Sequence, residues 1–132
     1  MTESSLHFFW KNQLCNVDDI KRTQTEKFIL DKKYRIDCFN PNEKICGEVE
    51  LNRNKIPYAI HKLNEALQKG VCEVGRLGVR DKDVDFAMDV SQIKNIEVIG
   101  QSEQSKYFQC DINKKSEISK CMNSRLSIFK NQ

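Results

Sequence analysis

The sequence contains no long hydrophobic run. No apolar stretch approaches the roughly 20 residues that a helix needs to cross a bilayer. The first ten residues, MTESSLHFFW, also lack the basic and apolar regions of a secretory signal. We therefore expect a cytoplasmic protein that does not insert into a membrane.

Histidine is scarce, and this limits the catalytic chemistry that the chain can perform. A Ser/His/Asp or Cys/His arrangement requires a histidine placed within a catalytic site. The chain has only two histidines, His7 near one end and His61 on the polar side of a predicted helix, four residues before Glu65. We therefore expect a protein without enzymatic activity, in which His61 and Glu65 form a surface pair.

No motif for a cofactor is complete. The segment Asp81–Asp85 has an acidic residue at every second position and resembles the start of a calcium-binding loop. However, Phe86 replaces the glycine of such a loop, and Gln92 replaces its final glutamate. The pair Gly75 and Gly78 is not followed by the Lys and Ser or Thr of a phosphate-binding loop. We expect no cofactor and no metal ion.

The six cysteines do not form a metal-binding pattern, because no two are separated by two residues and few histidines could complete a zinc site. Each lies in or beside an apolar segment, where a free thiol packs like a small hydrophobic side chain. We therefore expect free, mostly buried thiols, with three disulfides as the alternative. The cysteines are Cys15, Cys38, Cys46, Cys72, Cys110 and Cys121.

The composition is typical of a small soluble domain. Hydrophobic residues make up 39% of the 132-residue chain and charged residues 31%, which suits one domain with its own core. The apolar pattern predicts an α+β fold: a mostly antiparallel sheet of two hairpins and one or two further strands, packed by a central helix and by amphipathic helices at both ends. We expect an N-terminal helical segment (1–27), an α+β core (28–112) and a C-terminal helix (113–132).

The N-terminal region has a helical period. Residues 4–14 place apolar side chains at i, i+3, i+4 and i+8, and residues 17–27 are predicted to be helical as well. Phe8, Phe9 and Trp10 form the densest aromatic cluster of the chain. This cluster either packs on the core or anchors a partner protein.

Two alternating segments predict the first hairpin. Residues 34–39 and 45–51 follow the two-residue period of strands, and the Asn-Pro link between them favours a type I turn. If Cys38 pairs with Ile45, the apolar side chains of both strands share one face of the sheet. Cys38 and Cys46 would then lie on opposite faces.

The central helix is predicted over residues 54–69. Its apolar side chains form one stripe, Asn54 is the expected N-cap, and Pro57 is tolerated in the first turn. Gly70 stands where a left-handed residue commonly ends a helix, with Val71 closing back onto the last turn.

A second hairpin is predicted directly after this helix. Residues 71–79 and 84–90 alternate between apolar and polar side chains, on either side of a charged turn at Arg80–Asp83. This pairing places Arg76 opposite Ala87, diagonal to two aspartates. After this hairpin, the sequence predicts a turn or short helix at 91–95, a strand at 96–99 and a loop at 101–105. A strand at 107–112 and a final amphipathic helix at 115–130 follow.

Our leading hypothesis is a non-enzymatic protein that works by binding another protein. Mixed-sign charges on a rigid hairpin suit electrostatic recognition of a toxin, as by an immunity protein, or of a host defence complex, as by a phage or mobile-element inhibitor. The Asn- and Lys-rich composition favours a bacterial or phage source. The residues expected to bind the partner are Arg76, Arg80, Asp81, Asp83, Asp85 and Asp89.

Two alternatives stand beside this hypothesis. The whole basic excess lies in residues 101–132, with six basic and three acidic side chains, which favours a nucleic-acid-binding accessory protein. The residues that would contact nucleic acid are Lys106, Tyr107, Lys114 and Lys115. The other alternative is a small ligand-binding domain or enzyme with an acidic site at Asp85 and Asp89.

Overall fold

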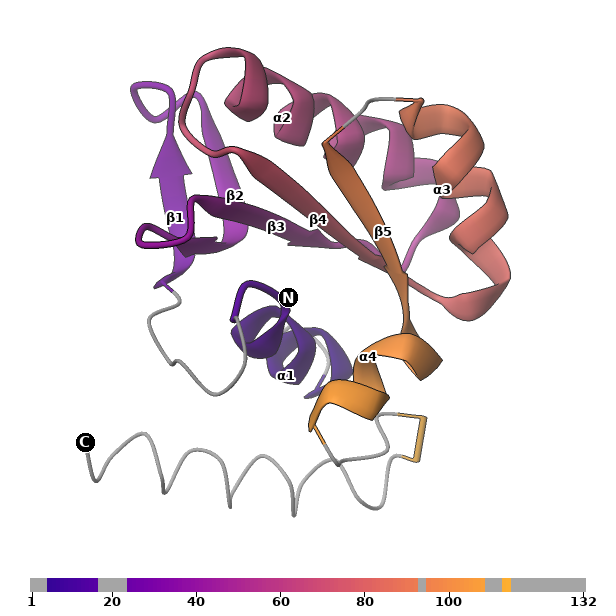
Figure 1. Ribbon diagram of the computed structural model, residues 1–132. Coiled ribbons are helices and arrows are strands. Elements are labelled where there is room, and N and C mark those ends of the chain that lie inside the picture. Colours follow the sequence, from indigo (N-terminus) through magenta and orange to yellow (C-terminus); the bar gives the residue numbers. More distant parts are fainter. Residues whose placement is uncertain (1–4, 17–23, 93–94, 109–112, 115–132) are drawn as a thin grey trace, which may run out of the picture.

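The computed structural model describes residues 5–16, 24–92, 95–108 and 113–114 (Figure 1). Within them, a five-stranded sheet lies between α1 on one face and α2 with α3 on the other. The helices are α1 (Ser5–Leu14), α2 (Ile56–Gln68), α3 (Val84–Ser91) and α4 (Gln101–Phe108), with short 3-10 turns η1 (Arg53–Lys55) and η2 (Asp81–Asp83). The strands are β1 (Gln24–Ile29), β2 (Tyr34–Asn40), β3 (Ile45–Val49), β4 (Val74–Val79) and β5 (Ile96–Gly100).

The sheet is mixed, in the order β1-β2-β3-β4-β5. The first three strands form an antiparallel meander, and β3, β4 and β5 run parallel. Parallel neighbours cannot be joined by a tight turn, so α2 connects β3 to β4 and α3 connects β4 to β5. The expected α+β class, the single domain, the N-terminal helix and the central helix are confirmed. The expected C-terminal helix at 115–130 lies outside the described residues.

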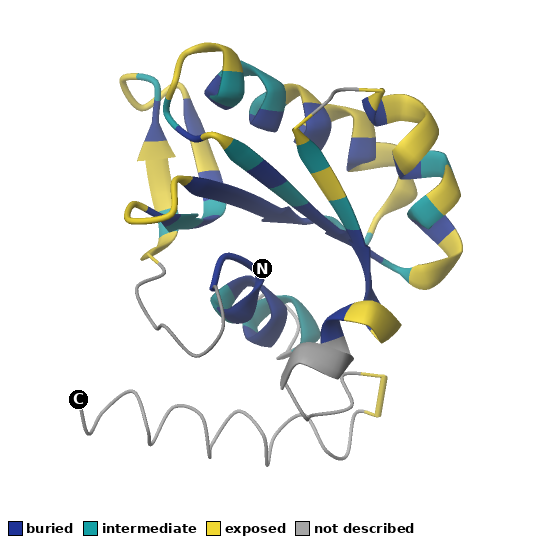
Figure 2. Ribbon diagram, viewed as in Figure 1, coloured by how far each residue is buried: buried dark blue, intermediate teal, exposed yellow. Residues whose placement is uncertain are grey.

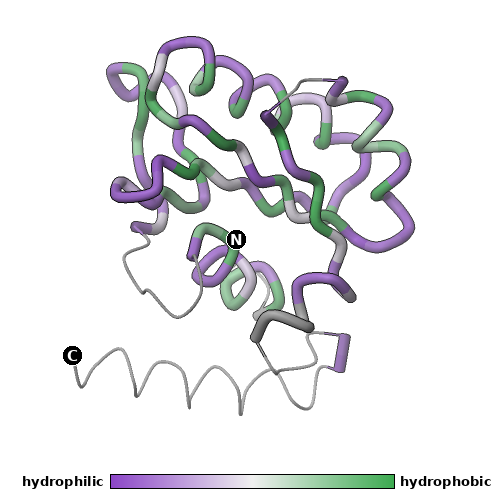
Figure 3. Tube along the Cα trace, in the orientation of Figure 1, coloured by the Kyte–Doolittle hydropathy of each residue, from purple (hydrophilic) through white to green (hydrophobic). Residues whose placement is uncertain are grey.

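One core cluster lies between the sheet and α2. The helix buries Ile56, Ala59, Ile60, Leu63 and Ala66 against β3 and β4. In Figure 3, α2 alternates between hydrophobic and hydrophilic residues, as an amphipathic helix does. Figure 2 shows the two central strands buried along most of their length, and the outer sides of α2 and α3 exposed. Burial on both faces is what parallel strands flanked by helices require.

The second core cluster lies between the sheet and α1. Trp10 is fully buried and packs against Gly78 of β4, where an added Cβ would lie 2.9 Å from the indole ring. Phe9 is buried as well, and Phe8 is half-buried. The N-terminal aromatic residues therefore belong to the core rather than to an exposed anchor. A side chain larger than hydrogen at position 78 would push α1 off the sheet.

A disulfide between Cys15 and Cys38 ties the end of α1 to β2. The expectation of free thiols is therefore wrong for this pair, because packing α1 against the sheet brings two distant cysteines together. Cys46 and Cys72 are free and buried, as expected. Cys110 and Cys121 lie outside the described residues.

The first hairpin forms, but its register differs from the predicted one by two residues. Cys38 pairs with Gly47, and Asn40 pairs with Ile45. A Cβ at Gly47 would lie 2.6 Å from the Cys15 sulfur, so only glycine fits opposite the disulfide. This packing, invisible in the hydrophobic pattern, sets the register.

The two faces of the first hairpin are also arranged differently from the prediction. Cys38 and Cys46 belong to the two different core clusters, so their expected placement on opposite faces is confirmed. However, Tyr34 and Ile36 pack on the α2 side, whereas Cys38 packs on the α1 side. The prediction that these three residues share one face is wrong, because β2 changes sides at Asp37.

The ends of α2 agree with the prediction except at the cap. Asn54 does not cap α2, because the helix follows directly on η1 and its N-cap position is Lys55, which makes no side-chain cap hydrogen bond. The side-chain cap belongs to η1, where the Asn52 side-chain oxygen accepts a hydrogen bond from the Asn54 N–H at 3.0 Å. At the other end Gly70 has a φ of +76°, and the Val71 N–H donates to the Ala66 carbonyl at 2.9 Å. The predicted glycine ending is therefore confirmed.

The predicted second hairpin is wrong. Residues 84–91 form helix α3, which crosses back so that β5 can run parallel to β4. Val84, Ala87 and Ser91 have helical spacing, and the last two are buried. The same segment alternates with period two, so its local pattern fits both structures, and the tertiary packing of β4 between β3 and β5 decides for the helix.

Three shorter predictions also fail. Residues 24–27, expected in a helix, belong to β1 because they pair with β2, and 17–23 lie outside the described residues. Residues 101–105, expected as a loop, begin α4. Residues 107–108 belong to the same helix rather than to a strand, and 109–112 lie outside the described residues.

Reducing the Cys15–Cys38 disulfide is expected to destabilise the protein. The two residues are 23 positions apart, and a crosslink over such a loop contributes about 3 kcal/mol. Thermal unfolding of the oxidised protein and of the Cys15→Ala/Cys38→Ala double variant measures the difference. The control is the double variant of the two free cysteines, Cys46→Ala/Cys72→Ala. It also leaves cavities in the core, but it breaks no disulfide. Equal stability with and without the disulfide would contradict its structural role.

Candidate functional site

Two carboxylates stand where the backbone ladder between β2 and β3 stops. The ladder joins residues 38–40 to residues 45–47 and goes no further. Beyond it, the Asp37 carboxylate accepts a hydrogen bond from the Val49 N–H at 2.8 Å, and the Glu48 carboxylate accepts one from the Asp37 N–H at 3.0 Å. Each side chain therefore replaces a backbone partner of the neighbouring strand, and the exchange fixes both acids side by side.

A lysine from α2 reaches the same place. The Lys62 ammonium donates to Glu48 at 2.9 Å and to the Arg35 carbonyl at 3.2 Å. Both charged side chains are largely buried, with Glu48 6% and Lys62 13% exposed. Buried ion pairs of this kind seldom add stability, because taking both charges out of water offsets their attraction.

A histidine from α1 completes the group on the other side. The His7 Nε2 lies 3.0 Å from the Val49 carbonyl oxygen and 3.3 Å from the Asp37 carboxylate. Four elements thus bring titratable side chains to one point of the sheet. We call His7, Asp37, Glu48 and Lys62 the carboxylate cluster.

The electrostatics of the carboxylate cluster favour a proton or another cation on Glu48. Burial, and then the nearby charge of Asp37, raise the pKa of the Glu48 carboxyl to about 7, although Lys62 opposes the rise. At neutral pH, Glu48 is therefore poised between its neutral and charged forms. A carboxyl group perturbed in this way by desolvation and a like charge is typical of a functional site.

The donor set of the carboxylate cluster suits a hard divalent cation. The Asp37 and Glu48 carboxylates and the Val49 carbonyl are oxygen ligands, which Mg²⁺ prefers. His7 Nε2 lies within hydrogen-bonding distance of the Asp37 carboxylate and the Val49 carbonyl, so these two oxygens lie close to one point. In the described part of the chain, no group of three or more His, Cys, Asp or Glu side chains is placed to hold a metal. A cation at this place would be held by two carboxylates and a backbone carbonyl, and water would have to complete its coordination.

Sequence reasoning missed the carboxylate cluster. The two-residue alternation of residues 45–51 puts Glu48 on the face opposite the apolar side chains, but β3 is buried at all five of its positions. An acid inside a strand that is buried on both faces is the signal that would have found the site. This signal requires knowing that β3 pairs in parallel with β4.

The structure does not bring the expected partner-binding residues together. The Arg76 side chain turns toward α1, where it donates to the Leu14 and Asn16 carbonyls at 2.9 and 3.0 Å. It also lies 3.4 Å from Glu97 of β5. Arg76 is therefore not opposite Ala87 and not near the α3 aspartates, as the hairpin prediction required. Its guanidinium therefore satisfies carbonyl groups at and just beyond the C-terminal end of α1.

The predicted charged turn, Arg80–Asp83, connects β4 to α3 and contacts neighbouring elements. Arg80 donates to the Leu51 carbonyl at 3.3 Å. Asp81 accepts from the Ser102 N–H at 3.0 Å, and therefore caps the first turn of α4. Asp83 is buried, whereas Asp85 and Asp89 are exposed on α3.

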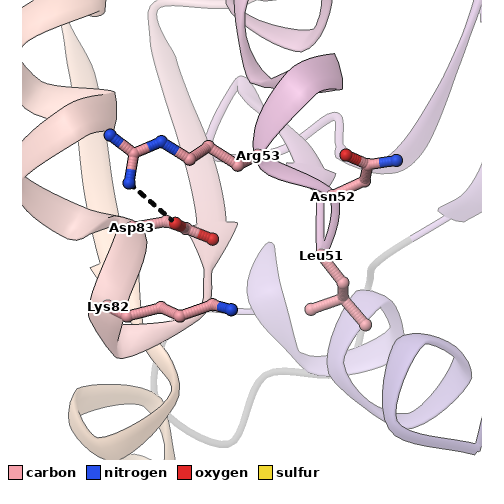
Figure 4. Close-up of a pocket in the computed structure, with 5 residues that line it drawn as sticks. All are labelled: Leu51, Asn52, Arg53, Lys82 and Asp83. Atoms are coloured by element: carbon pink, nitrogen blue, oxygen red, sulfur yellow. Dashed lines mark ion pairs between the residues drawn. The ribbon is translucent and has the colours of Figure 1, made fainter.

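A cavity lies beside this turn. It measures about 520 Å³ and is lined by Leu51, Asn52, Arg53, Lys82 and Asp83 (Figure 4). We call it the Asp83 cavity. Neither Asp85 nor Asp89 lines it, so the predicted acidic ligand site at these two residues is not formed by this cavity.

The residues of the alternative nucleic-acid segment are only partly described. Lys106 and Tyr107 belong to α4, and Lys114 is exposed. Lys115 lies outside the described residues. The expected surface pair of His61 and Glu65 is confirmed, with 3.1 Å between Nε2 and the carboxylate.

Comparison of the chain with known protein families, with curated proteins and with solved structures found no match. No helix in the described ranges is long and apolar enough to cross a membrane. The predicted cytoplasmic location, the absence of enzymatic activity and the predicted partners stay predictions.

Glu48 is expected to make the stability of the protein depend on pH. Its raised pKa means that the folded protein binds a proton more tightly than the unfolded chain, so the free energy of unfolding falls as the pH rises from about 4.5 to about 7. Glu48→Gln removes this loss, which amounts to roughly 3 kcal/mol. Urea unfolding of both proteins at pH 4.5, 6 and 8 measures it. A constant difference between the two proteins across this range would contradict the assignment.

Proposed function

We propose that the protein hydrolyses phosphodiester bonds of nucleic acid at the carboxylate cluster, with a divalent cation as cofactor. The observation that carries the proposal is the convergence of Asp37, Glu48 and Lys62 where β2 and β3 separate. Burying two acids and a lysine together costs stability. Such a group is therefore more typical of a functional site than of a core that only packs.

The cation would be held by the Asp37 and Glu48 carboxylates and by the Val49 carbonyl. When bound, such a cation polarises a phosphoryl oxygen and lowers the pKa of a bound water. Glu48 would give up its proton in favour of the cation, because a positive charge beside a carboxylate favours the ionised form. His7, hydrogen-bonded at the same point, would have to yield its position.

Lys62 supplies the positive charge that the acids do not. Its ammonium is held by Glu48 and the Arg35 carbonyl, so it is oriented before any substrate arrives. A preorganised cation of this kind stabilises negative charge that develops on a phosphate in the transition state. Asp37 and Glu48 are oriented in turn by backbone N–H groups.

The geometry disfavours other reactions of paired carboxylates. A glycosidase holds its two acids on either side of the scissile bond, whereas the Asp37 and Glu48 side chains each hydrogen-bond the backbone of the neighbouring strand. A protease dyad of two acids shares one proton, whereas Glu48 is paired with a lysine. Cation-assisted phosphoryl chemistry uses both the acids and the lysine.

A nucleic acid suits the surface next to the carboxylate cluster. Phe28 of β1 and Arg35 of β2 pair directly across the strands and are 54% and 61% exposed, and the Arg35 guanidinium also lies 3.0 Å from the Glu26 carboxylate. Arg35 is two residues before Asp37 on the same strand. An exposed aromatic ring beside a cation is the combination that binds single-stranded nucleic acid.

The proposal predicts cleavage of nucleic acid that requires Mg²⁺ or Mn²⁺ and both acids. Asp37→Asn and Glu48→Gln should each lower the cleavage rate by about 100-fold or more, because each removes a cation ligand. The rate is measured on labelled single- and double-stranded DNA and on RNA. Glu73→Gln, which changes a 74% exposed glutamate outside the carboxylate cluster, is the matched control and should cleave at the wild-type rate. Absence of cleavage on all substrates with either cation, or equal rates in all four proteins, would remove the proposal.

A second candidate is the non-enzymatic protein-binding function expected from the sequence, of the immunity-protein or phage-inhibitor type. The observation that favours it is the outer side of α3, where Met88 is 56% and Val90 37% exposed. Asp85 and Asp89 on the same helix add charge beside these apolar side chains. If this face binds a partner, Met88→Asp should abolish co-purification of that partner and leave nucleic acid cleavage unchanged. Unchanged co-purification of the partner in Met88→Asp would rule out binding through this face of α3.

A further inference from the structure

The Asp83 cavity lies at the carboxyl ends of two parallel strands. Leu51, Asn52 and Arg53 follow β3, and Lys82 and Asp83 follow β4. In sheets with parallel strands, ligands commonly bind outside these ends, where the loops to the crossover helices meet. The cavity shares no residue with the carboxylate cluster, so an inference about it does not depend on the proposed function.

Asp83 is the unusual group of the cavity. It is 1% exposed, and neither carboxylate oxygen has a hydrogen-bond partner among the described residues. The nearest cation, the Arg53 guanidinium, lies 3.7 Å away. A buried carboxylate without hydrogen bonds is strongly unfavourable unless a donor reaches it. Figure 4 shows the carboxylate between the two loops that line the cavity, on the side of the Arg53 guanidinium.

Two cations stand at the rim of the same space. Arg53 lies over the Phe86 ring at 4.3 Å, and this contact holds its guanidinium in place. Lys82 extends from the opposite side of the cavity (Figure 4). Leu51 contributes the apolar part of the lining.

These charges exclude the simplest ligands. A purely cationic group would be repelled by Arg53 and Lys82, and a purely anionic group would leave Asp83 without a hydrogen-bond donor. The cavity therefore suits a molecule that carries an anion at one end and hydrogen-bond donors at the other. Its volume of about 520 Å³ lies within the range of small-molecule sites.

We infer that the Asp83 cavity binds a nucleoside monophosphate. The phosphate contacts Arg53 and Lys82, and an amino group of the base or a ribose hydroxyl donates to Asp83. Acidic side chains accept hydrogen bonds from base amino groups, and basic ones bind phosphate. The base lies against Leu51.

Isothermal titration with AMP, CMP, GMP and UMP, in the absence of divalent cations, tests this inference on the full chain. At least one of them should bind, and more tightly than either inorganic phosphate or its own nucleoside, because each of these makes only half of the contacts. Asp83→Asn and Lys82→Gln should each weaken binding by about tenfold. Lys69→Gln changes an exposed lysine away from the cavity and should bind as the wild type does.

Three results would overturn the inference. They are no binding of any of the four nucleotides, binding of inorganic phosphate as tight as that of the best nucleotide, and unchanged affinity in Lys82→Gln. If Asp83→Asn fails to fold, as judged by its thermal unfolding curve, Lys82→Gln and Arg53→Gln decide the question. Because this titration uses intact Asp37 and Glu48 and no metal, its failure would leave the proposed cleavage activity standing.

Discussion

The rest of the structure depends on the reciprocal hydrogen bonds between Asp37 and β3. The Asp37 carboxylate binds the Val49 N–H, and the Asp37 N–H binds the Glu48 carboxylate. These bonds end the regular ladder between β2 and β3, and β2 changes faces at this point. They also place two carboxyl groups side by side, where the Lys62 ammonium from α2 pairs with Glu48 and His7 from α1 lies 3.3 Å from Asp37. The strand geometry and the proposed site therefore have one cause.

The two helical layers are held by different means. On one side α2 packs a continuous apolar stripe on the sheet, which local sequence encodes fully. On the other side α1 is fixed by Trp10 on Gly78, by the Cys15–Cys38 disulfide and by Arg76 at its last carbonyls. Because His7 lies on α1, these contacts also set how closely the helix covers the carboxylate cluster. Stability and access to the site are thus controlled by the same helix.

The sequence predicts well those features that neighbouring residues determine. The helix over residues 54–69 and its ending at Gly70 follow from spacing and from one backbone conformation. Residues 84–90 fit both periods, and only the parallel pairing of β4 selects the helix. The site was missed for a related reason, since Glu48 becomes unusual only once β3 is known to be buried on both faces. Properties that depend on the topology of the sheet cannot be read from local patterns.

Asp37 and Glu48 are proposed to form a cation site, and Mn²⁺ binding followed by electron paramagnetic resonance tests this site most directly. At pH 7.5 the wild-type protein should bind Mn²⁺ at one site, and Mg²⁺ should displace it. Glu48→Gln and Asp37→Asn should bind at least tenfold more weakly, because each loses one ligand oxygen. The Glu73→Gln control should match the wild type. If Mn²⁺ does not bind, or binds equally to all four proteins, Asp37 and Glu48 do not form a cation site and the carboxylate cluster is structural.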